Sequence, residues 1–300
     1  MRIFLTGATG FVGSAVTQEL LKHGHQVLGL ARSDANAAAL TAAGAQPHRG
    51  DLQDLGALRS GALQSDATIH CGFIHDFSKF QENCDIDALA IETMGNALAG
   101  SNKPFIVTSG TALLTGTGGT TEDVPAPPPS AAVPRVSEAA AFAFTDKGVR
   151  TAAIRLPPSV HGAGDHGFIP ILINLARQKG AAAYIGEGQN RWPAVHRFDA
   201  AVLYRLAIEK AQEKGTTGAV YHSVADTGVP FREIAAVIGR GLNVPVVSKT
   251  PDEAKEHFGW FAHFAGIDNL ASSEWTRKQL GWTPTQPGLL ADMEKHYFSH

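Results

Sequence analysis

The sequence predicts an α/β fold in which a doubly wound parallel sheet is followed by a smaller C-terminal lobe. Strand-like and helix-like patterns alternate as far as about residue 156, and a glycine-rich turn follows the first strand-like run. The chain has 300 residues, which is ordinary for a sheet domain plus a second lobe. We therefore expect a sheet domain over 1–155 and a second lobe over 156–300, with segments of the latter returning to the sheet.

The N-terminal stretch carries the strongest motif. The apolar run Ile3–Leu5 is followed by Gly7, Gly10 and Gly13 at three-residue spacing and then by a helical pattern. Gly7 permits a tight turn, Gly10 leaves space for a pyrophosphate, and Gly13 lets the helix approach the strand. The first N–H groups of the helix then face the phosphate charge. The stretch therefore predicts a dinucleotide-binding site lined by Gly7, Thr9, Gly10, Phe11, Val12 and Gly13.

The stretch Thr6–Gly13, with the spacing GxxGxxG, resembles the extended and atypical short-chain dehydrogenase/reductases, the family of nucleotide-sugar epimerases and dihydroflavonol reductases. The resemblance is clear over about the first half of the chain, patchier from 157 to 199, and confined to the general layout beyond 200. It implies a Rossmann sheet, a nicotinamide cofactor and a small-molecule substrate held by the second lobe.

Composition and charge exclude several other classes of protein. Hydrophobic residues make up 44% of the chain and the net charge is −3, which favours a globular protein that binds neither nucleic acid nor an anionic membrane. The two cysteines lack metal-type spacing, no signal-peptide pattern opens the chain, and no apolar run reaches about 18 residues. We expect a reduced, cytoplasmic protein without a metal site or membrane span, and the oligomeric state stays open.

A second strand is expected at Gln26–Ala31, and the residues after it select the cofactor. An acidic side chain would accept hydrogen bonds from the ribose 2′-hydroxyl of NAD(H), whereas a basic one suits the 2′-phosphate of NADP(H). Arg32 and Ser33 follow the strand, and no acidic residue precedes Asp34 there. NADP(H) is therefore expected, bound by Arg32 and Ser33. Asp34 is expected to cap the helix Ala35–Ala43.

The third strand, Gln46–Arg49, is followed by Asp51 and Leu52. The resemblance implies that this Asp-Leu pair contacts the adenine of the cofactor. Alternatively, Asp51 caps the next helix, expected at Leu52–Ala62, and the two roles are compatible.

The fourth strand is expected at Thr68–Cys71, and its end lies at the carboxyl edge of the sheet, where ligands bind in open α/β sheets. The cofactor site is then expected to include the residues at this strand end: Cys71, Gly72 and Phe73. Cys71 is expected to be a small buried contact and not a nucleophile. The polar and aromatic segment Ile74–Asn83 is expected to form a substrate-side loop that includes His75.

A long helix, Asp85–Gly100, leads to the fifth strand, Phe105–Thr108. The resemblance implies that the cluster after this strand, here Ser109 and Thr111, supplies a catalytic hydroxyl. It also implies an Asn in the preceding helix. Asp87 falls near that place and departs from the family in residue type.

Eight glycines and prolines lie between Gly116 and Pro134, which predicts a loop near the carboxyl edge and excludes a helix or central strand. A helix, Arg135–Lys147, and the sixth strand, Val149–Leu156, follow. The next segment resembles the part of the family that passes the nicotinamide. Cofactor contacts are therefore implied for Pro157 and Pro158. Thr108, at the end of the fifth strand, is also expected to contact the cofactor.

The rest of the chain predicts the smaller elements of the second lobe. These are helices at Phe168–Gln178, Phe198–Lys210 and Phe231–Gly239, strands at Ala182–Ile185, Gly218–Ser223 and Asn243–Ser248, and small helices from 251 to 300. Arg191–Asp199 resembles a family element that frames the substrate pocket, which implies Trp192 and His196 as substrate contacts. Five aromatic residues are expected to fill the core of this lobe: Trp260, Phe261, Phe264, Trp275 and Trp282.

The decisive departure from the resembled family concerns its Tyr-x-x-x-Lys dyad. In that family the Tyr transfers a proton to or from the carbonyl oxygen, and the Lys lowers the pKa of the Tyr. Alignment on Glu138 puts Ser130 and Pro134 in these places, and no tyrosine precedes Tyr184. General acid–base catalysis contributes about 10²–10⁴ in rate, so another group must protonate the oxygen or the substrate must be activated.

We expect Ser109 and Thr111 to polarise the carbonyl oxygen, His161 to donate the proton, and Asp87 to orient His161 or a water. The alternative donors are His75, His196 and Tyr184. For any one of the histidines a purely structural role competes with the catalytic one.

Two classes of function are compatible with the sequence. One is an NADP(H)-dependent oxidoreductase of atypical type, or an epimerase/dehydratase, that acts on a small carbonyl or hydroxyl compound. The other is a non-catalytic NADP(H)-binding redox sensor or regulator. The absent dyad favours the second class. The turn Ser109–Thr111, the His161 segment and a full second lobe favour the first, which we prefer.

Overall fold

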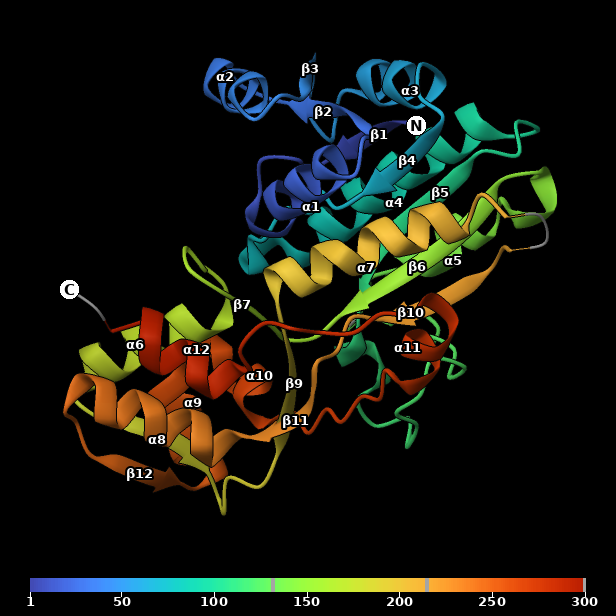
Figure 1. Cartoon of the computed structure of the whole chain (residues 1–300). Coiled ribbons are helices and arrows are strands. Elements are labelled where there is room, and N and C mark those ends of the chain that lie inside the picture. The colour runs from blue at the N-terminus through green and yellow to red at the C-terminus, as the bar shows by residue number, and fades with distance from the viewer. Residues whose placement is uncertain (131–132, 214–215, 299–300) are drawn as a thin grey trace.

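The computed structural model describes residues 1–130, 133–213 and 216–298. Its centre is a parallel sheet of seven strands in the order β10-β6-β5-β4-β1-β2-β3 (Figure 1). The strands are β1 (Arg2–Thr6), β2 (Gln26–Ala31), β3 (Gln46–Arg49), β4 (Ala67–His70), β5 (Pro104–Gly110), β6 (Arg150–Leu156) and β10 (Ala219–His222). The predicted doubly wound α/β fold is therefore confirmed, and the seventh strand comes from the second half of the chain.

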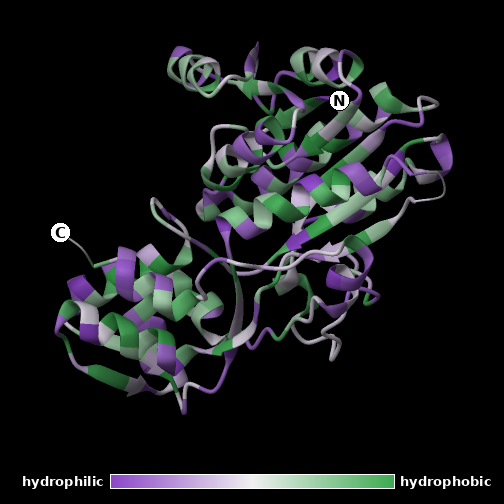
Figure 2. Cartoon of the chain, viewed as in Figure 1, coloured by the Kyte–Doolittle hydropathy of each residue, from purple (hydrophilic) through white to green (hydrophobic). Residues whose placement is uncertain are grey.

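Helices cover both faces of this sheet. The helices α1 (Phe11–Lys22), α2 (Asp34–Ala42) and α7 (Arg197–Lys210) pack on one face, and α3 (Leu55–Leu63), α4 (Phe80–Leu98) and α5 (Ser137–Phe142) pack on the other. Alternate residues of β1 supply the two apolar layers: Ile3 and Leu5 face α1, whereas Phe4 faces α3 and α4. Figure 2 shows the resulting hydrophobic colouring along the central strands.

At the starts of two helices, the capping residue is not the one predicted. Ser33, and not Asp34, caps α2 by accepting a hydrogen bond from the backbone N–H of Asn36. Asp54, and not Asp51, caps α3 by accepting one from Ala57, so that α3 begins three residues later than expected. In both cases a second polar residue nearby is equally able to cap, and the path of the chain after the strand selects between them.

The other helix boundaries differ modestly. The helix α4 begins at Phe80, five residues before the expected start, because part of the expected substrate-side loop is helical and includes the 3-10 turn η1 (Phe77–Lys79). The helix α5 is shorter than expected: it ends at Phe142, and a 3-10 turn, η3 (Thr145–Lys147), replaces its last part. Gly148, at φ +73°, then turns the chain into β6.

The 3-10 turn η2 (Thr111–Leu114) follows β5, and the described residues from 116 to 134 form neither helix nor strand, as expected. The helix that follows, α5, begins at Ser137, two residues after the expected start. Residues 131–132 of the proline-rich segment 116–134, and residues 299–300 at the end of the expected C-terminal helices, lie outside the described residues. Among the described residues, no helix has the length and apolar character needed to cross a membrane.

The second lobe is built on two small sheets that the helical and strand patterns only partly predicted. One contains β7 (Ser159–His161), β9 (Arg191–His196) and β11 (Asp226–Pro230), and the other pairs β8 (Ala182–Ile185) with β12 (Val246–Lys249). Its helices are α6 (Phe168–Lys179), α8 (Phe231–Leu242), α9 (Pro251–Phe258), the 3-10 turn η4 (Gly259–Phe261), α10 (Ala262–Gly266) and α12 (Leu289–His296). Apart from β7, whose Val160 packs against the central sheet, these elements contribute to one apolar cluster, separate from the two layers of that sheet (Figure 1).

The five aromatic residues expected in the core of this lobe differ in location and burial. Phe261 is buried there, whereas Trp282 packs against the α1 face of the central sheet, just after α11 (Glu274–Leu280), and its indole N–H donates to the carbonyl of Asp199. Phe264 is only half-buried, and Trp260 and Trp275 are exposed. Helical spacing alone does not separate a core aromatic residue from one that faces a cavity.

Candidate active site

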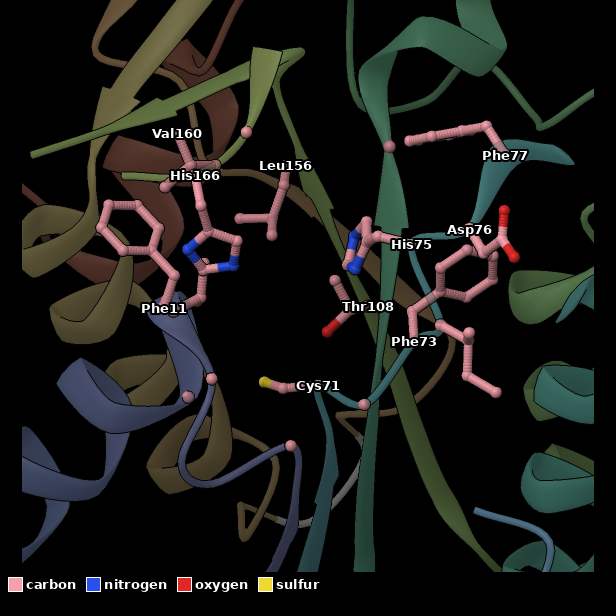
Figure 3. Close-up of a pocket in the computed structure, with 18 of the residues that line it drawn as sticks. Phe11, Cys71, Phe73, His75, Asp76, Phe77, Thr108, Leu156, Val160 and His166 are labelled. Atoms are coloured by element: carbon pink, nitrogen blue, oxygen red, sulfur yellow. The ribbon is translucent and has the colours of Figure 1, made fainter. Parts of the chain in front are cut away.

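A cavity of about 1310 Å³ lies at the carboxyl edge of the central sheet, between the two lobes (Figure 3). It is lined by residues that directly follow β1, β2, β4 and β6 and by the last residues of β5, which is where ligands bind in open α/β sheets. The residues predicted for the cofactor line it with one exception: Gly7, Thr9, Gly10, Phe11, Val12, Gly13, Arg32, Asp51, Leu52, Cys71, Gly72, Phe73, Thr108, Pro157 and Pro158. The exception is Ser33, whose hydroxyl caps α2.

The glycine turn has the geometry that phosphate binding requires. Gly7 has φ +67°, and a Cβ on it would lie 2.8 Å from the backbone nitrogen of Gly72. A Cβ on Gly13 would lie 1.9 Å from the carbonyl oxygen of Gly7, so helix α1 comes this close to β1 only with glycine at this position. A Cβ on Gly10 would contact only the Gly7 carbonyl oxygen, at 3.2 Å, and otherwise project into open space. The start of α1 is thus an open cradle of backbone N–H groups.

The region around Arg32 carries positive charge. The guanidinium of Arg32 is exposed, lines the cavity, and forms no hydrogen bond or ion pair with any residue that the structure describes. The nearest acid in sequence, Asp34, is paired with Arg49. Asp51 accepts hydrogen bonds from the backbone N–H groups of Gln53 and Asp54, so its carboxylate orders the turn before α3.

A buried tyrosine that the sequence analysis did not select lies under the centre of the cavity. Tyr204 projects from α7, and its hydroxyl is 2.7 Å from Thr108 Oγ1. Thr108 Oγ1 in turn donates to the carbonyl of His70 at 2.8 Å. Burial raises the pKa of Tyr204 well above its usual value. Burial also raises the pKa of the neighbouring Cys71 thiol to about 11, so Cys71 is a thiol and not a nucleophilic thiolate near neutral pH.

Two polar groups reach the cavity from β5 and from the end of the proline-rich segment. Ser109 lines the cavity, and its buried hydroxyl has no hydrogen-bond partner among the described residues. Arg135 follows the position aligned with the family's lysine, and the sequence analysis missed it. Its guanidinium donates to the carbonyl of Thr108 at 2.9 Å and lies 4.4 Å from the centre of the Phe73 ring. The sequence did contain a signal for Arg135: a positive charge one residue after Pro134, the position aligned with the family's lysine.

His75 is the predicted histidine that lines the cavity. Figure 3 shows its ring directed into the same space as Thr108 and Cys71. Loss of contact with water within the cleft disfavours the charged imidazole and so lowers the pKa of His75. The positive charge of Arg135 and the neighbouring His166 lower it further.

Asp87 and Thr111, both predicted to be catalytic, do not line the cavity. Asp87 is 2% exposed, and its carboxylate lies 3.1 Å from His70 Nε2 and accepts a hydrogen bond from Ser137 at 2.5 Å. Burial acts to raise the pKa of Asp87, but the hydrogen bonds and the charge of Arg135 outweigh it and lower the pKa. Thr111 is fully buried and donates to the side-chain oxygen of Asn269 at 2.7 Å. Each side chain is held by a buried partner, so neither Asp87 nor Thr111 is placed where it could contact a ligand in this cavity.

The other two histidines considered as donors, and Trp192, also lie away from the cavity. His161 is fully buried, and its Nδ1 is 2.8 Å from Asp292 on α12. His196 caps α7 and packs edge-on against the His161 ring at 5.4 Å. Trp192 is buried in the apolar cluster of the second lobe. These side chains turn inward because β7 and β9 form a sheet, which sequence reasoning had not predicted. Tyr184, on β8, is not among the cavity residues either.

Among the described residues, no three His, Cys, Asp or Glu side chains gather in a way that could hold a metal ion.

Comparisons with known proteins agree with this geometry. Residues 3–221 match the sequence model of the NAD dependent epimerase/dehydratase family. The chain is 50% identical over 297 residues to an uncharacterized protein of Schizosaccharomyces pombe, with 98% of each chain covered. It is 29% identical to the 2-alkyl-3-oxoalkanoate reductase of Stenotrophomonas maltophilia over 83% of this chain and 78% of that one. The dTDP-glucose 4,6-dehydratase DesIV from Streptomyces venezuelae, solved with NAD bound, has the same fold: the TM-score is 0.77 at 21% identity, with 98% and 95% of the chains covered.

Proposed function

This chain belongs to the NAD-dependent epimerase/dehydratase family, and we propose that it is an NADP(H)-dependent oxidoreductase that interconverts a small carbonyl compound and its alcohol. The observation that carries the proposal is the single cavity that joins the glycine turn, the unpaired Arg32 and the unpartnered hydroxyl of Ser109. A dinucleotide and a small substrate fit together within about 1310 Å³.

The residues of the cavity fit a nicotinamide dinucleotide. The open cradle at Gly10 suits a pyrophosphate, and the N–H groups at the start of α1 favour its charge. Arg32 suits a 2′-phosphate, because its unpaired guanidinium would gain a charge-assisted hydrogen bond there, and the nearest acid in sequence, Asp34, is paired with Arg49. Solved relatives such as DesIV hold NAD, so the preference for NADP(H) is a proposal about this chain alone.

The bound cofactor would supply or accept the hydride, and the chain's own groups handle the substrate oxygen. We assign to Ser109 the hydrogen bond that polarises the carbonyl, since its hydroxyl is buried beside the cavity without another partner. His75 delivers the proton in place of the predicted His161. Arg135 adds positive charge near Thr108, which stabilises negative charge that develops on the substrate oxygen.

The names of two relatives favour hydride exchange between a carbonyl and its alcohol over rearrangement of a sugar nucleotide. One is the 2-alkyl-3-oxoalkanoate reductase, and another, 28% identical over 248 residues, is the sterol-4-alpha-carboxylate 3-dehydrogenase of Dictyostelium discoideum. The solved structures with similar folds include a dTDP-glucose 4,6-dehydratase and a UDP-glucose-4-epimerase, so UDP-glucose is a probe beside the ketones in the following subsection.

The experiment measures cofactor affinity by calorimetry and then NADPH oxidation with a panel of carbonyl compounds. We expect NADPH to bind more tightly than NADH. Arg32→Ala should weaken NADPH binding about 10- to 150-fold, because removal of a charged hydrogen-bond partner costs about 1.5–3 kcal/mol, and should leave NADH binding nearly unchanged. Equal affinity of the parent protein for both cofactors would refute the preference for NADP(H).

A non-catalytic NADP(H) sensor is the second candidate, and one observation favours it. Among the described residues that line the cavity there is no lysine, and the one tyrosine, Tyr204, is fully buried with its hydroxyl bonded to Thr108. Tight binding of NADPH without oxidation of NADPH by any carbonyl compound would support this candidate against the oxidoreductase.

A further inference from the structure

Five aromatic side chains gather on the cavity wall that the η1 turn and the second lobe supply together. We call this set the aromatic rim; it consists of Phe77, Phe80, Phe168, Trp260 and Phe264. Phe77 is the centre of the rim, with its ring 5.6 Å from Trp260 and 5.4 Å from Phe264. The rings of Phe77 and Trp260 are stacked, with an angle of 22° between their planes. A contact between Phe77 and Trp260 therefore joins the two lobes at the cavity wall.

Much of the apolar surface of the aromatic rim is exposed to solvent. Trp260 is 58% exposed, and Phe77 and Phe264 are only half-buried. Apolar surface left in water is unfavourable, and large exposed patches within a concavity are characteristic of ligand sites. An apolar group that enters the cavity would remove this surface from water.

The charges around the rim do not suit a second nucleotide. Of the described residues that line the cavity, Arg32 and Arg135 are the two with a permanent positive charge, and Arg32 is engaged by the cofactor in the proposed function. Two acids, Asp76 and Asp165, line the same cavity near the rim. Two more phosphates from a sugar nucleotide would meet one cation and two carboxylates, which is unfavourable.

The nearest helix terminus is also occupied. Helix α6 begins at Phe168, a member of the rim, and the backbone N–H of Gly167 already donates to the carboxylate of Asp165 at 2.6 Å. The hydroxyl of Tyr297 donates to the same carboxylate at 2.7 Å. An anion at this terminus would replace a built-in carboxylate and face its charge.

From these observations we infer that the substrate carries an uncharged apolar body, aromatic or branched aliphatic, which packs on the aromatic rim while its carbonyl group lies at Ser109. Sugar nucleotides are excluded as substrates. The inference rests on the proposed function for the carbonyl chemistry, but the binding preference of the rim is independent of turnover.

The experiment compares two methyl ketones that differ in one end group, 4-phenyl-2-butanone and 4-hydroxy-2-butanone, with UDP-glucose as the sugar-nucleotide probe. We expect kcat/KM for the phenyl ketone to exceed that for the hydroxy ketone at least about tenfold, and no turnover of UDP-glucose. Trp260→Ala should reduce this ratio about 10- to 100-fold, mainly through KM. Phe77→Leu, which keeps an apolar side chain, should reduce it less.

Trp275→Ala is the matched control, because Trp275 is also an exposed tryptophan but does not line this cavity. It should leave the ratio unchanged, and the affinity of each variant for NADPH reports that the fold is intact. Calorimetry of 4-phenyl-2-butanone with the NADP⁺ complex separates the two proposals. If the ketone binds, Trp260→Ala weakens that binding and no ketone is turned over, then the rim binds apolar groups as inferred but the protein is not an oxidoreductase. Equal kcat/KM for both ketones, or a ratio that Trp260→Ala leaves unchanged, would overturn the inference.

Discussion

Helix α1 lies close to β1 because residue 13 has no side chain. A Cβ at Gly13 would lie 1.9 Å from the Gly7 carbonyl oxygen, and no side-chain rearrangement relieves a contact with backbone. The geometry of the phosphate-binding turn thus depends on single atoms. Elsewhere in the cavity, ring contacts surround His75: the centre of its ring is 5.4 Å from that of Phe73 and 6.3 Å from that of Phe77.

The first prediction at this scale concerns His75. His75→Gln should reduce turnover of a carbonyl substrate about 100-fold or more, because it removes the proposed proton donor, while the affinity for NADPH stays nearly the same. The protonated imidazole is the donor, so the wild-type rate should fall as pH rises through the pKa of His75. Since that pKa is lowered, the fall should lie below pH 6.5. The pH dependence of kcat measures this limb, which His75→Gln should lack.

The matched control is the same substitution at a buried histidine. His161→Gln removes a side chain that contacts Asp292 and does not line the cavity. It should lower thermal stability and leave the pH limb of the rate in place. Full activity of His75→Gln would show that His75 is not the proton donor and that another group supplies the proton.

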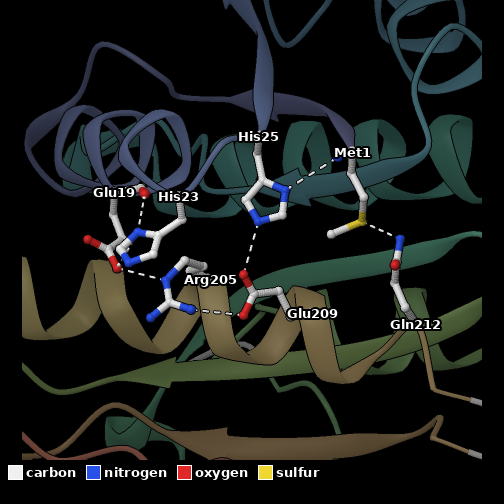
Figure 4. Close-up of polar contacts among 7 residues, drawn as sticks. All are labelled: Met1, Glu19, His23, His25, Arg205, Glu209 and Gln212. Atoms are coloured by element: carbon white, nitrogen blue, oxygen red, sulfur yellow. Dashed lines mark hydrogen bonds and ion pairs between the residues drawn. The ribbon is translucent and has the colours of Figure 1, made fainter.

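At the scale of elements, polar contacts join α1 to α7 on the outer surface of the sheet domain (Figure 4). Arg205 on α7 donates to Glu19 on α1 and to Glu209 one turn further along α7, each at 2.8 Å. Glu209 also lies 3.0 Å from His25 Nε2. Since α7 carries Tyr204, these contacts help to hold the residue under the cavity in place.

Arg205→Ala should lower the free energy of unfolding by about 1–2 kcal/mol, because it leaves the half-buried Glu19 and Glu209 without their charged partner. The urea midpoint should fall while the slope of the transition stays constant. Arg240→Ala is the control: its pair with Glu294 is exposed, and its loss should change the free energy by less than about 0.5 kcal/mol. Equal effects of the two variants would show that the α1–α7 contact adds no stability.

At the scale of the whole molecule, buried histidines couple folding to pH. Besides His75, three further histidines have a pKa that burial lowers: His196, His222 and His257. An unfolded chain binds protons at these rings near pH 6.5, whereas the folded protein binds them only at lower pH. Their contribution to stability is therefore complete above pH 6.5 and is lost as pH falls from 6.5 toward the folded-state pKa values.

Urea unfolding between pH 7.5 and 5.5 tests this coupling. The free energy of unfolding should fall as pH decreases, over a window that lies above the usual range of carboxyl groups. His257→Gln should reduce the pH dependence, because it removes one of the three rings. A stability that stays constant or rises toward pH 5.5 would mean that these histidines do not determine the acid response.

Local patterns determined the sheet domain and the cofactor end of the cavity. The glycine spacing, the apolar runs and the residues at strand ends are short-range features, and parallel strands bring their carboxyl ends together without further information. This is why Gly10, Arg32 and Cys71 line the cavity as expected. The same logic predicted the loop after β5 and the absence of a helix there.

Tertiary structure alone decided which polar side chains reach the cavity. Asp87, Thr111 and His161 are held by His70, Asn269 and Asp292, partners that lie 17, 158 and 131 residues away in the chain. Such pairings depend on how distant elements pack, and a buried polar group takes the partner that packing offers. Tyr204 and Trp260 reach the cavity for the same reason, since the packing of α7 and the second lobe determines which of their faces meets the sheet edge. The local sequence around these residues contains no signal for that choice.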